Sequence, residues 1–259
     1  MLRFRSLGSG SAGNALLVQA FDGLHRSTLL VDCGLGIRRL NERIEQAGLQ
    51  ANAIDAVFIT HEHADHIGSA VAFVQRHGLP LYMSLGTWQA IGEPALGAQC
   101  HIVSDGEPVA VGGLDLRPFT VPHDAREPLQ LTVGDGARRL GVLTDLGHVS
   151  AYAASCLAGC EALMLECNHD AAMLAAGPYP MFLKQRVGGL WGHLSNDQAA
   201  ELLCSLTHAR LRHVVAAHLS EQNNLPELAQ QAIAQALGAR ADDIEIATAT
   251  GTRDWLVVD

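Results

Sequence analysis

The sequence lacks long apolar runs, long polar tracts and tandem repeats. No apolar run approaches the ~20 residues of a transmembrane helix, and the first residues carry no apolar segment typical of a secretory signal. Charged residues make up 17% and hydrophobic residues 48% of the 259 residues. We therefore expect a soluble, cytoplasmic protein with no membrane partner, in which residues 1–259 form one domain without a linker.

Cysteine is also sparse. The six cysteines are scattered, and no CxxC pair is present. A disulfide framework requires a secreted protein, and nothing in the sequence indicates secretion. Cys156 and Cys160 could share a metal ion, but small buried thiols are the interpretation that we favour.

Basic residues are outnumbered by acidic ones. The sequence has 17 lysines and arginines against 27 acidic residues, which gives a net charge of −10. A broad nucleic-acid-binding surface is normally basic, so this balance argues against one. Divalent cations bound at a site would add positive charge there. The net charge alone therefore does not decide between nucleic acid and a smaller substrate.

Short apolar runs predict β-strands, and longer stretches between them predict helices. Strands are expected at residues 15–20, 28–32, 56–60, 114–121, 129–133, 140–144, 162–166 and 211–217. Helices are expected at residues 37–47, 65–77, 195–207 and 226–237. Continuously apolar strands are typical of sheets covered on both faces. The predicted fold class is therefore α/β: an αββα sandwich of two mixed β-sheets with helices on the outer faces.

The most informative segment is residues 61–66, His-Glu-His-Ala-Asp-His, which follows the apolar run 56–60. Four of these six side chains can bind a metal ion. Three imidazoles and a carboxylate so close together can hardly serve a single ion. We expect His61 and His63 to turn to one cation, and Asp65 and His66 to turn to another.

The same placement recurs further along the chain. A side chain that can bind metal directly follows an apolar strand at His123, at Asp145 and at His218. Because strand ends are rigid and can still face a cleft, these ends together with His61 could form one preorganised set of ligands.

The ligands divide into two sets. We assign the first cation to three histidines: His61, His63 and His123. We assign the second cation to one carboxylate and two histidines: Asp65, His66 and His218. Asp145 has two oxygens and could bridge both cations, each of which would keep an open position, as in catalytic sites. The donors suit Zn²⁺ or Mn²⁺, and also Fe²⁺.

This pattern resembles the metallo-β-lactamase superfamily, whose HxHxDH motif has an upstream aspartate and a downstream histidine, aspartate and histidine. The matching positions are Asp32, residues 61–66, His123, Asp145 and His218. They extend over nearly the whole chain. The resemblance implies the αββα fold and a metal-dependent hydrolase, but the superfamily is broad in its chemistry.

Further segments look like the YycJ/WalJ group, which resembles the nucleases of this fold and implies exonuclease activity on DNA. These segments are residues 9–14, 122–125, 144–147, 168–170, 192–196 and 218–224. The Gly-His-Leu-Ser sequence at 192–195 is also similar to a late motif of tRNA 3′-processing endonucleases, where the histidine assists catalysis. By that resemblance His193 is a catalytic candidate. The chain shows no long arm for holding tRNA, which disfavours tRNA processing itself.

The working hypothesis is hydrolysis of phosphodiester bonds in nucleic acid, in DNA rather than RNA. A hydroxide that bridges the two metals would attack phosphorus, and His193 would protonate the leaving oxygen. The predicted catalytic residues are His193 and Asp65, the latter also as a ligand. We expect Asp32 to orient a ligand histidine rather than to bind metal itself.

The loop around residues 9–14 and a strand end at residue 168 supply candidate substrate contacts. Ser9, Ser11 and Asn14 could belong to an anion-binding nest or only to a tight turn. Asn168 and His169 could contact substrate or hold ligands in place, and the sequence does not distinguish between these two roles.

A basic segment before residue 193 supplies the remaining candidates. Lys184 and Arg186 could contact phosphates, while Trp191 could stack on a base. The simpler alternative, which we favour on the sequence alone, is a loop packed on the core with two solvated charges.

Three other functions compete with a nuclease. A small-molecule hydrolase of the same fold, acting on a phosphoester, thioester or lactone, needs the same metals and is favoured by the acidic net charge. An iron-centred oxidoreductase usually needs a flavin partner or a sulfur substrate, and no flavin-binding segment is visible. A metal-free scaffold would leave seven polar groups poorly satisfied in a core.

Overall fold

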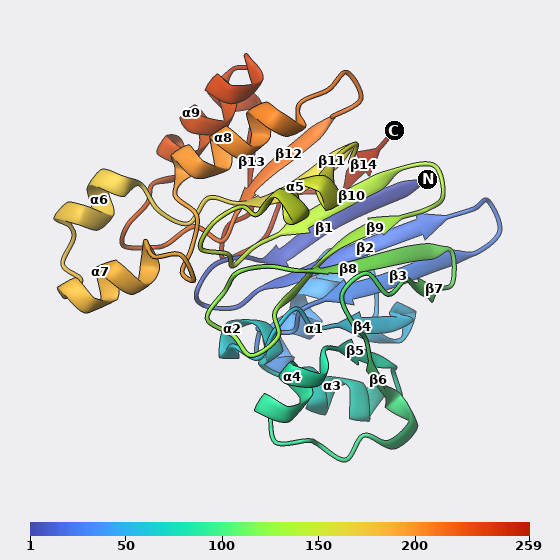
Figure 1. Cartoon of the computed structure of the whole chain (residues 1–259). Helices are drawn as coiled ribbons and strands as arrows, with labels where there is room; N and C mark the ends of the chain where they lie inside the picture. The colour runs from blue at the N-terminus through green and yellow to red at the C-terminus, as the bar shows by residue number, and fades with distance from the viewer.

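Two β-sheets of seven strands each pack face to face, and helices cover both outer faces (Figure 1). The computed structural model describes residues 1–259. Each sheet contains parallel and antiparallel pairs, so the sheets are mixed. This is the predicted αββα sandwich, and the predicted fold class is confirmed.

The first sheet has the strand order β14-β1-β2-β3-β4-β5-β6. Its neighbours are antiparallel from β14 to β3 and parallel from β3 to β6. The strands are β1 (Leu2–Gly8), β2 (Ala15–Phe21), β3 (Arg26–Val31), β4 (Ala56–Phe58), β5 (Leu81–Met83), β6 (Cys100–Ile102) and β14 (Leu256–Val258).

The second sheet repeats this arrangement in the order β13-β12-β11-β10-β9-β8-β7. Its neighbours are antiparallel from β7 to β10 and parallel from β10 to β13. The strands are β7 (Val109–Val111), β8 (Leu114–Thr120), β9 (Leu129–Gly134), β10 (Arg139–Leu143), β11 (Ala162–Glu166), β12 (His213–Ala217) and β13 (Glu245–Ile246).

Helices from the first half of the chain lie on the outer side of the first sheet, and helices from the second half lie on the outer side of the second sheet (Figure 1). The first set is α1 (Ile37–Gln46), α2 (Ala64–Ile67), α3 (Ala70–His77) and α4 (Leu85–Ala90). The second set is α5 (Ala151–Leu157), α8 (Asn196–Leu206) and α9 (Pro226–Leu237). Three short 3₁₀ turns are Ala51–Ala53, Gly97–Gln99 and Ala241–Asp243.

Alternate residues of the central strands enter different cores, as the two-residue period of a strand requires. In β11, Ala162 and Met164 join a cluster of 24 buried residues between the sheets. Leu163 and Leu165 point the other way, into the cluster beneath α5, α8 and α9. Both faces of the strand are therefore apolar, which explains why its sequence reads as a continuous apolar run.

The expectation of a single helix over residues 65–77 is wrong. The chain forms α2, stops at Gly68 and Ser69, and begins again as α3. Gly68 has a φ of +29°, and a Cβ there would lie 2.5 Å from the carbonyl oxygen of Cys33. The close approach of the segment around Cys33 to the helical segment therefore breaks the helix.

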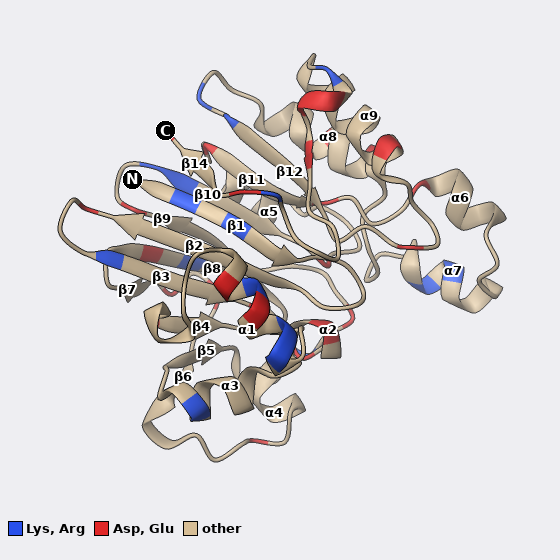
Figure 2. Ribbon diagram, turned by 180° about the vertical axis from the view of Figure 1, so that it is seen from behind, with Lys and Arg blue, Asp and Glu red and all other residues tan.

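Two short helices, α6 (Ala171–Ala176) and α7 (Met181–Val187), extend away from the sandwich (Figure 1). The alternative of a loop packed on the core over this segment is therefore wrong: α7 is a helix with exposed Met181 and Phe182. Its charged residues are both basic, Lys184 and Arg186 (Figure 2).

None of the helices is both long enough and apolar enough to span a lipid bilayer.

Candidate metal centre

The candidate ligands lie where strands of both sheets end at one edge of the sandwich. Three of the four non-glycine residues with positive φ stand at these ends: Asp32 after β3, Asp145 after β10 and His218 after β12. Their φ values are 62°, 59° and 56°. Such left-handed backbone is uncommon outside glycine and gathers at functional sites. The strain marks this edge as the functional one.

Three histidines form a first donor group. Ring nitrogens of His61, His63 and His123 all lie within 4.8 Å of one another. His123 Nε2 is 3.3 Å from His63 Nδ1. His61 and His123 are buried, and His63 is partly exposed. One cation could therefore take a nitrogen from each ring.

A carboxylate and two histidines form a second donor group. Donor atoms of Asp65, His66 and His218 also lie within 4.8 Å of one another. Asp65 Oδ2 is 3.4 Å from His218 Nε2 and 3.5 Å from His66 Nε2. These are the two sets that the sequence predicts, and the fold brings each of them together.

Asp145 stands between the two groups. It forms a donor group of its own with His61 from the first set and His66 from the second. Its Oδ2 is 3.1 Å from His66 Nε2, and its Oδ1 is 3.4 Å from His218 Nδ1. This position suits a carboxylate shared by two cations.

Two buried atoms at the centre of the cluster fit a metal ion. Neither His61 Nε2 nor Asp145 Oδ2 has a hydrogen-bond partner of normal geometry, although both are shielded from solvent. Leaving a buried polar atom unpaired costs about 1–3 kcal/mol. Coordination of a divalent cation would satisfy both atoms, so the residues present fit the metals that the donor set implies.

Hydrogen bonds around Asp32 fix the orientation of two histidines. Asp32 Oδ2 accepts from His66 Nδ1 at 2.7 Å, so His66 Nε2, which lies 3.0 Å from the Asn14 amide, is the ring nitrogen that a metal could take. Asp32 also accepts from the Thr60 hydroxyl at 3.0 Å. Thr60 Oγ1 in turn lies 3.0 Å from His61 Nδ1, which leaves His61 Nε2 free. Asp32 therefore has the position of an orienting residue, as the sequence predicts.

Glu166 is a residue that the sequence reasoning missed. It is buried at the end of β11, and its Oε1 lies 2.8 Å from His193 Nδ1 and 3.1 Å from His218 Nδ1. Its Oε2 accepts from the backbone N–H of Leu146 and of Leu194. Glu166 also forms a donor group with Asp145, His193 and His218. Because both of its oxygens are engaged by hydrogen-bond partners, we interpret it as an anchor for the two histidines. A charged residue that ends an otherwise apolar strand was the one weak signal of it in the sequence.

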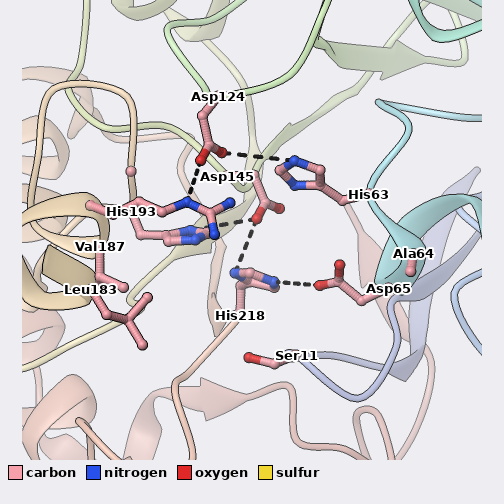
Figure 3. Close-up of a pocket in the computed structure, with 12 residues that line it drawn as sticks. Ser11, His63, Ala64, Asp65, Asp124, Asp145, Leu183, Val187, His193 and His218 are labelled. Carbon is pink, nitrogen blue, oxygen red and sulfur yellow. Dashed lines mark hydrogen bonds and ion pairs between the residues drawn. The ribbon is translucent and has the colours of Figure 1, made fainter. Parts of the chain in front are cut away.

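His193 is oriented by Glu166 and lines the cavity beside the metal cluster (Figure 3). With Nδ1 engaged by Glu166, Nε2 is the ring nitrogen left for a substrate. Burial tends to lower the pKa of His193, but the charge of Glu166 and the hydrogen bond to it raise that pKa above its usual value. Burial tends to raise the pKa of Glu166. The charge of His193 and the hydrogen bonds to His193 and His218 outweigh burial and lower that pKa to about 2.

The rest of the cluster is a coupled set of acids and bases. Burial tends to raise the pKa of Asp145, but His218 and His66 hold it well below its usual value. Burial tends to lower the pKa of His218, but Asp145 and the hydrogen bonds to Asp65 and Glu166 raise it to about 10. These directions favour a proton on His218, which a bound cation would replace.

A cavity of about 320 Å³ opens beside this cluster (Figure 3). It is lined by Ser11, His63, Ala64, Asp65, Asp124, Asp145, Leu183, Arg186, Val187, Gly192, His193 and His218. Asp124 Oδ2 pairs with Arg186 Nε at 2.6 Å, and its Oδ1 lies 3.4 Å from His123 Nε2. Helix α7 therefore borders the cavity and is joined by an ion pair to the loop that carries His123.

Of the three predicted substrate contacts in the loop of residues 9–14, one faces the cavity and two are buried. Ser11 is exposed and lines the cavity. Ser9 is buried, and its hydroxyl accepts from the backbone N–H of His218. Asn14 is buried, and its amide donates to the backbone and the carboxylate of Asp65. Ser11 alone of the three is available to a substrate in the cavity.

The other four predicted substrate contacts also differ in whether they face the cavity. Asn168 donates to the backbone oxygen of His218 and is buried, and His169 is buried next to it. Lys184 turns away, with its Nζ donating to the carbonyl of Ala175. Arg186 lines the cavity. Among these four, Arg186 is the residue placed to meet a substrate.

The comparisons with known proteins agree with this geometry. A family model described as "Beta-lactamase superfamily domain" matches residues 27–219. The chain is 35% identical to exodeoxyribonuclease YycJ of Bacillus anthracis over 91% of this chain and 89% of that protein. It is 33% identical to exodeoxyribonuclease WalJ of Streptococcus pneumoniae over 93% of this chain and 89% of that protein.

Among solved structures, the metallo-β-lactamase fold protein YhfI from Bacillus subtilis superimposes with a TM-score of 0.74. The match covers 96% of this chain and 97% of that one at 17% identity, and so concerns the fold. The chain therefore belongs to the metallo-β-lactamase superfamily, is a metal-dependent hydrolase of that fold, and has the YycJ and WalJ exodeoxyribonucleases among its relatives.

Proposed function

We propose that residues 1–259 form one hydrolase domain that cleaves phosphodiester bonds of DNA as an exonuclease, with two divalent metal ions. The observation that carries this proposal is the pair of donor groups beside a cavity lined by His193, with Asp145 close to His61 of the first group and to His66 of the second. Zn²⁺ and Mn²⁺ fit the histidine and carboxylate donors best.

The first group would hold one cation through His61, His63 and His123, and the second group would hold another through Asp65, His66 and His218. Two cations bound there supply a nucleophile from water at neutral pH and stabilise charge on the phosphoryl oxygens. Asp65 keeps the negative charge that a ligand needs. Burial tends to raise its pKa, but His218 and His66 lower that pKa below the usual value.

His193 supplies the acid in this proposal. Because Glu166 raises its pKa, His193 keeps a proton at a higher pH than a free histidine does. Its ring borders the cavity in which the scissile phosphate would lie. It is therefore placed to protonate the leaving oxygen, a role that typically contributes roughly 10²–10⁴-fold in rate.

DNA is favoured as the substrate for two reasons. The YycJ and WalJ relatives are named exodeoxyribonucleases, and this chain covers most of each. In addition, Arg186 is the single lysine or arginine that lines the cavity, where it could bind a phosphate.

A small-molecule hydrolase of the same fold is the second candidate. The cavity volume of about 320 Å³ lies at the lower end of the range for small-ligand sites. Leu183 and Val187 of α7 line one side of it. The net charge of −10 opposes a large polyanion. Such an enzyme would hydrolyse a phosphoester, thioester or lactone and leave DNA intact.

A substrate panel tests the proposal. Protein loaded with Mn²⁺ or Zn²⁺ is assayed against end-labelled DNA, RNA and a generic phosphodiester, and we expect DNA to be degraded from its ends. His193→Ala is expected to lower kcat by roughly 10²–10⁴-fold with unchanged metal content. His25→Ala, at an exposed site in the β2–β3 turn, is the matched control and should behave as wild type.

The outcomes separate the two candidates. Hydrolysis of a small ester with no cleavage of DNA would replace the nuclease by the second candidate. A His193→Ala variant that keeps its metals and cleaves DNA at the wild-type rate would remove the catalytic assignment of His193.

A further inference from the structure

Large apolar side chains are exposed next to the cavity. Phe182 is 71% exposed, Leu190 68%, Met181 67% and Trp191 61%; of the exposed large apolar residues of the chain, Leu24 alone is more exposed than these. We call these four residues the apolar rim. Gathered apolar side chains in solvent mark interaction sites more often than isolated ones do.

The backbone that carries Leu190 and Trp191 is firmly held. Three successive carbonyls accept hydrogen bonds from loops of the metal site. Leu190 O accepts from His148 Nδ1 at 3.0 Å, and Trp191 O accepts from the Asp124 N–H at 2.9 Å. Gly192 O accepts from His123 Nδ1 at 3.0 Å. Trp191 is therefore exposed although its backbone is firmly held.

Glycines permit this close attachment. A Cβ on Gly147, two residues after Asp145, would overlap the backbone of Leu190 and Trp191. A Cβ on Gly192 would overlap the carbonyl oxygens of Arg186 and Val187. The turn between α7 and His193 thus packs against the metal-site loop on one side and folds back on α7 on the other.

Residues of the apolar rim adjoin cavity-lining residues along the chain. Leu183, Arg186 and Val187 of α7 line the cavity, and so does Gly192, the residue after Trp191. A ligand with a charged part at the metals and Arg186, and a flat apolar part outside the cavity, would fit both regions. A nucleotide has these two parts, a phosphate and a base.

We propose that Trp191 stacks on the terminal base of the DNA strand whose end lies in the cavity, and so selects strand ends. This inference rests on the proposed nuclease function. The last base of a strand has one face that is not covered by a neighbouring base, whereas an internal base of a duplex has none. An indole on this firmly held turn, next in sequence to the cavity-lining Gly192, would therefore favour an end over an internal position.

Paired substrates test the contact. Two DNA duplexes differ in whether the terminal nucleotide of the cleaved strand carries a base or is abasic. Trp191→Ala is expected to lower kcat/KM on the base-bearing end by about 5- to 150-fold, the equivalent of about 1–3 kcal/mol for one stacked base. The loss on the abasic end should be much smaller. Trp191→Phe should keep most of the wild-type preference.

Tryptophan fluorescence gives a readout that does not depend on activity. The other two tryptophans, Trp88 and Trp255, are partly buried, so Trp191 is the one open to a base. Binding of the base-bearing duplex to metal-free protein should quench the fluorescence, and Trp191→Phe should lose this quenching. Leu24→Ala, at an exposed apolar residue in the β2–β3 turn, is the control and should change neither readout.

Each failure has its own pattern. If wild type cleaves DNA and Trp191→Ala loses equally on both ends, or loses nothing on either, the stacking contact is wrong and the nuclease function stands. If metal-loaded wild type cleaves no DNA, the proposed function is overturned and this inference with it.

Discussion

At the scale of the residue, the candidate centre consists of residues that could bind metal and of residues that hold their side chains in place. The ligands were visible in the sequence because imidazoles and carboxylates at strand ends have few structural uses in a core. Glu166 was not visible, because it reads as the last residue of an apolar strand. Only the fold shows that it contacts His193 and His218. Asp32 was predicted to orient one histidine, and the structure adds His61 through Thr60.

Glu166→Gln tests the anchoring role. Glutamine keeps the shape but not the charge, so the pKa of His193 should fall. His193 would then lose its proton at a lower pH, and the alkaline limb of the pH–rate profile should move to lower pH. Activity at neutral pH should drop by up to the roughly 10²–10⁴-fold that an acid contributes. The profile is measured on protein saturated with metal, with the metal content determined in parallel, because Glu166 also contacts the candidate ligand His218.

Glu161→Gln is the matched control for this change. Glu161 is buried at the other end of the same segment and pairs with Arg210 instead of a histidine. Its profile should match that of wild type. An unshifted profile for Glu166→Gln would show that the charge of Glu166 does not tune His193.

At the scale of the element, apolar runs located the central strands because both faces of those strands are buried. The short strands β5, β6 and β7 escaped prediction because three residues are too few to show a period. Helix α7 escaped because it exposes apolar residues instead of burying them. The break between α2 and α3 depends on a contact with Cys33, distant in sequence, which no local pattern contains.

Gly68→Ala tests the break between α2 and α3. A Cβ at Gly68 would crowd Cys33 O, so we expect a loss of about 1–3 kcal/mol in the free energy of unfolding. Because α2 carries Asp65 and His66, metal affinity should fall as well. Thermal unfolding and metal titration measure the two effects.

Gly36→Ala is the control for crowding. Gly36 has no positive φ, and its Cβ would meet nothing within 4 Å. It should unfold as wild type does. Equal stability of Gly68→Ala and Gly36→Ala would contradict the packing argument.

At the scale of the whole molecule, the two sheets each contribute candidate ligands to one cluster. His61 and His63 follow a strand of the first sheet, whereas Asp145 and His218 follow strands of the second. Bound cations would therefore connect the two halves of the sandwich. The sequence predicted this convergence from the resemblance and from strand ends, but it could not give the placement of α7 beside the cavity.

Metal should stabilise the folded chain, and more so at higher pH. A ligand at 100 times its Kd adds about 2.7 kcal/mol to the free energy of unfolding. Metal must displace a proton from His218, whose pKa the surrounding carboxylates raise to about 10 against the lowering effect of burial. Proton competition weakens as pH rises, so the increase in Tm on adding Zn²⁺ should be larger at pH 8 than at pH 6. An increase that is absent, or that shrinks with pH, would contradict this coupling.

The most direct measurement is the metal content of the protein after loading and removal of free ions. We predict about two ions per wild-type chain, because each of the two donor groups could hold one ion. We predict about one ion when His61→Ala removes a ligand of the first group, and about one when His218→Ala removes a ligand of the second. Wild-type protein that takes up no metal, or variants that hold as much as wild type, would contradict the two-metal centre.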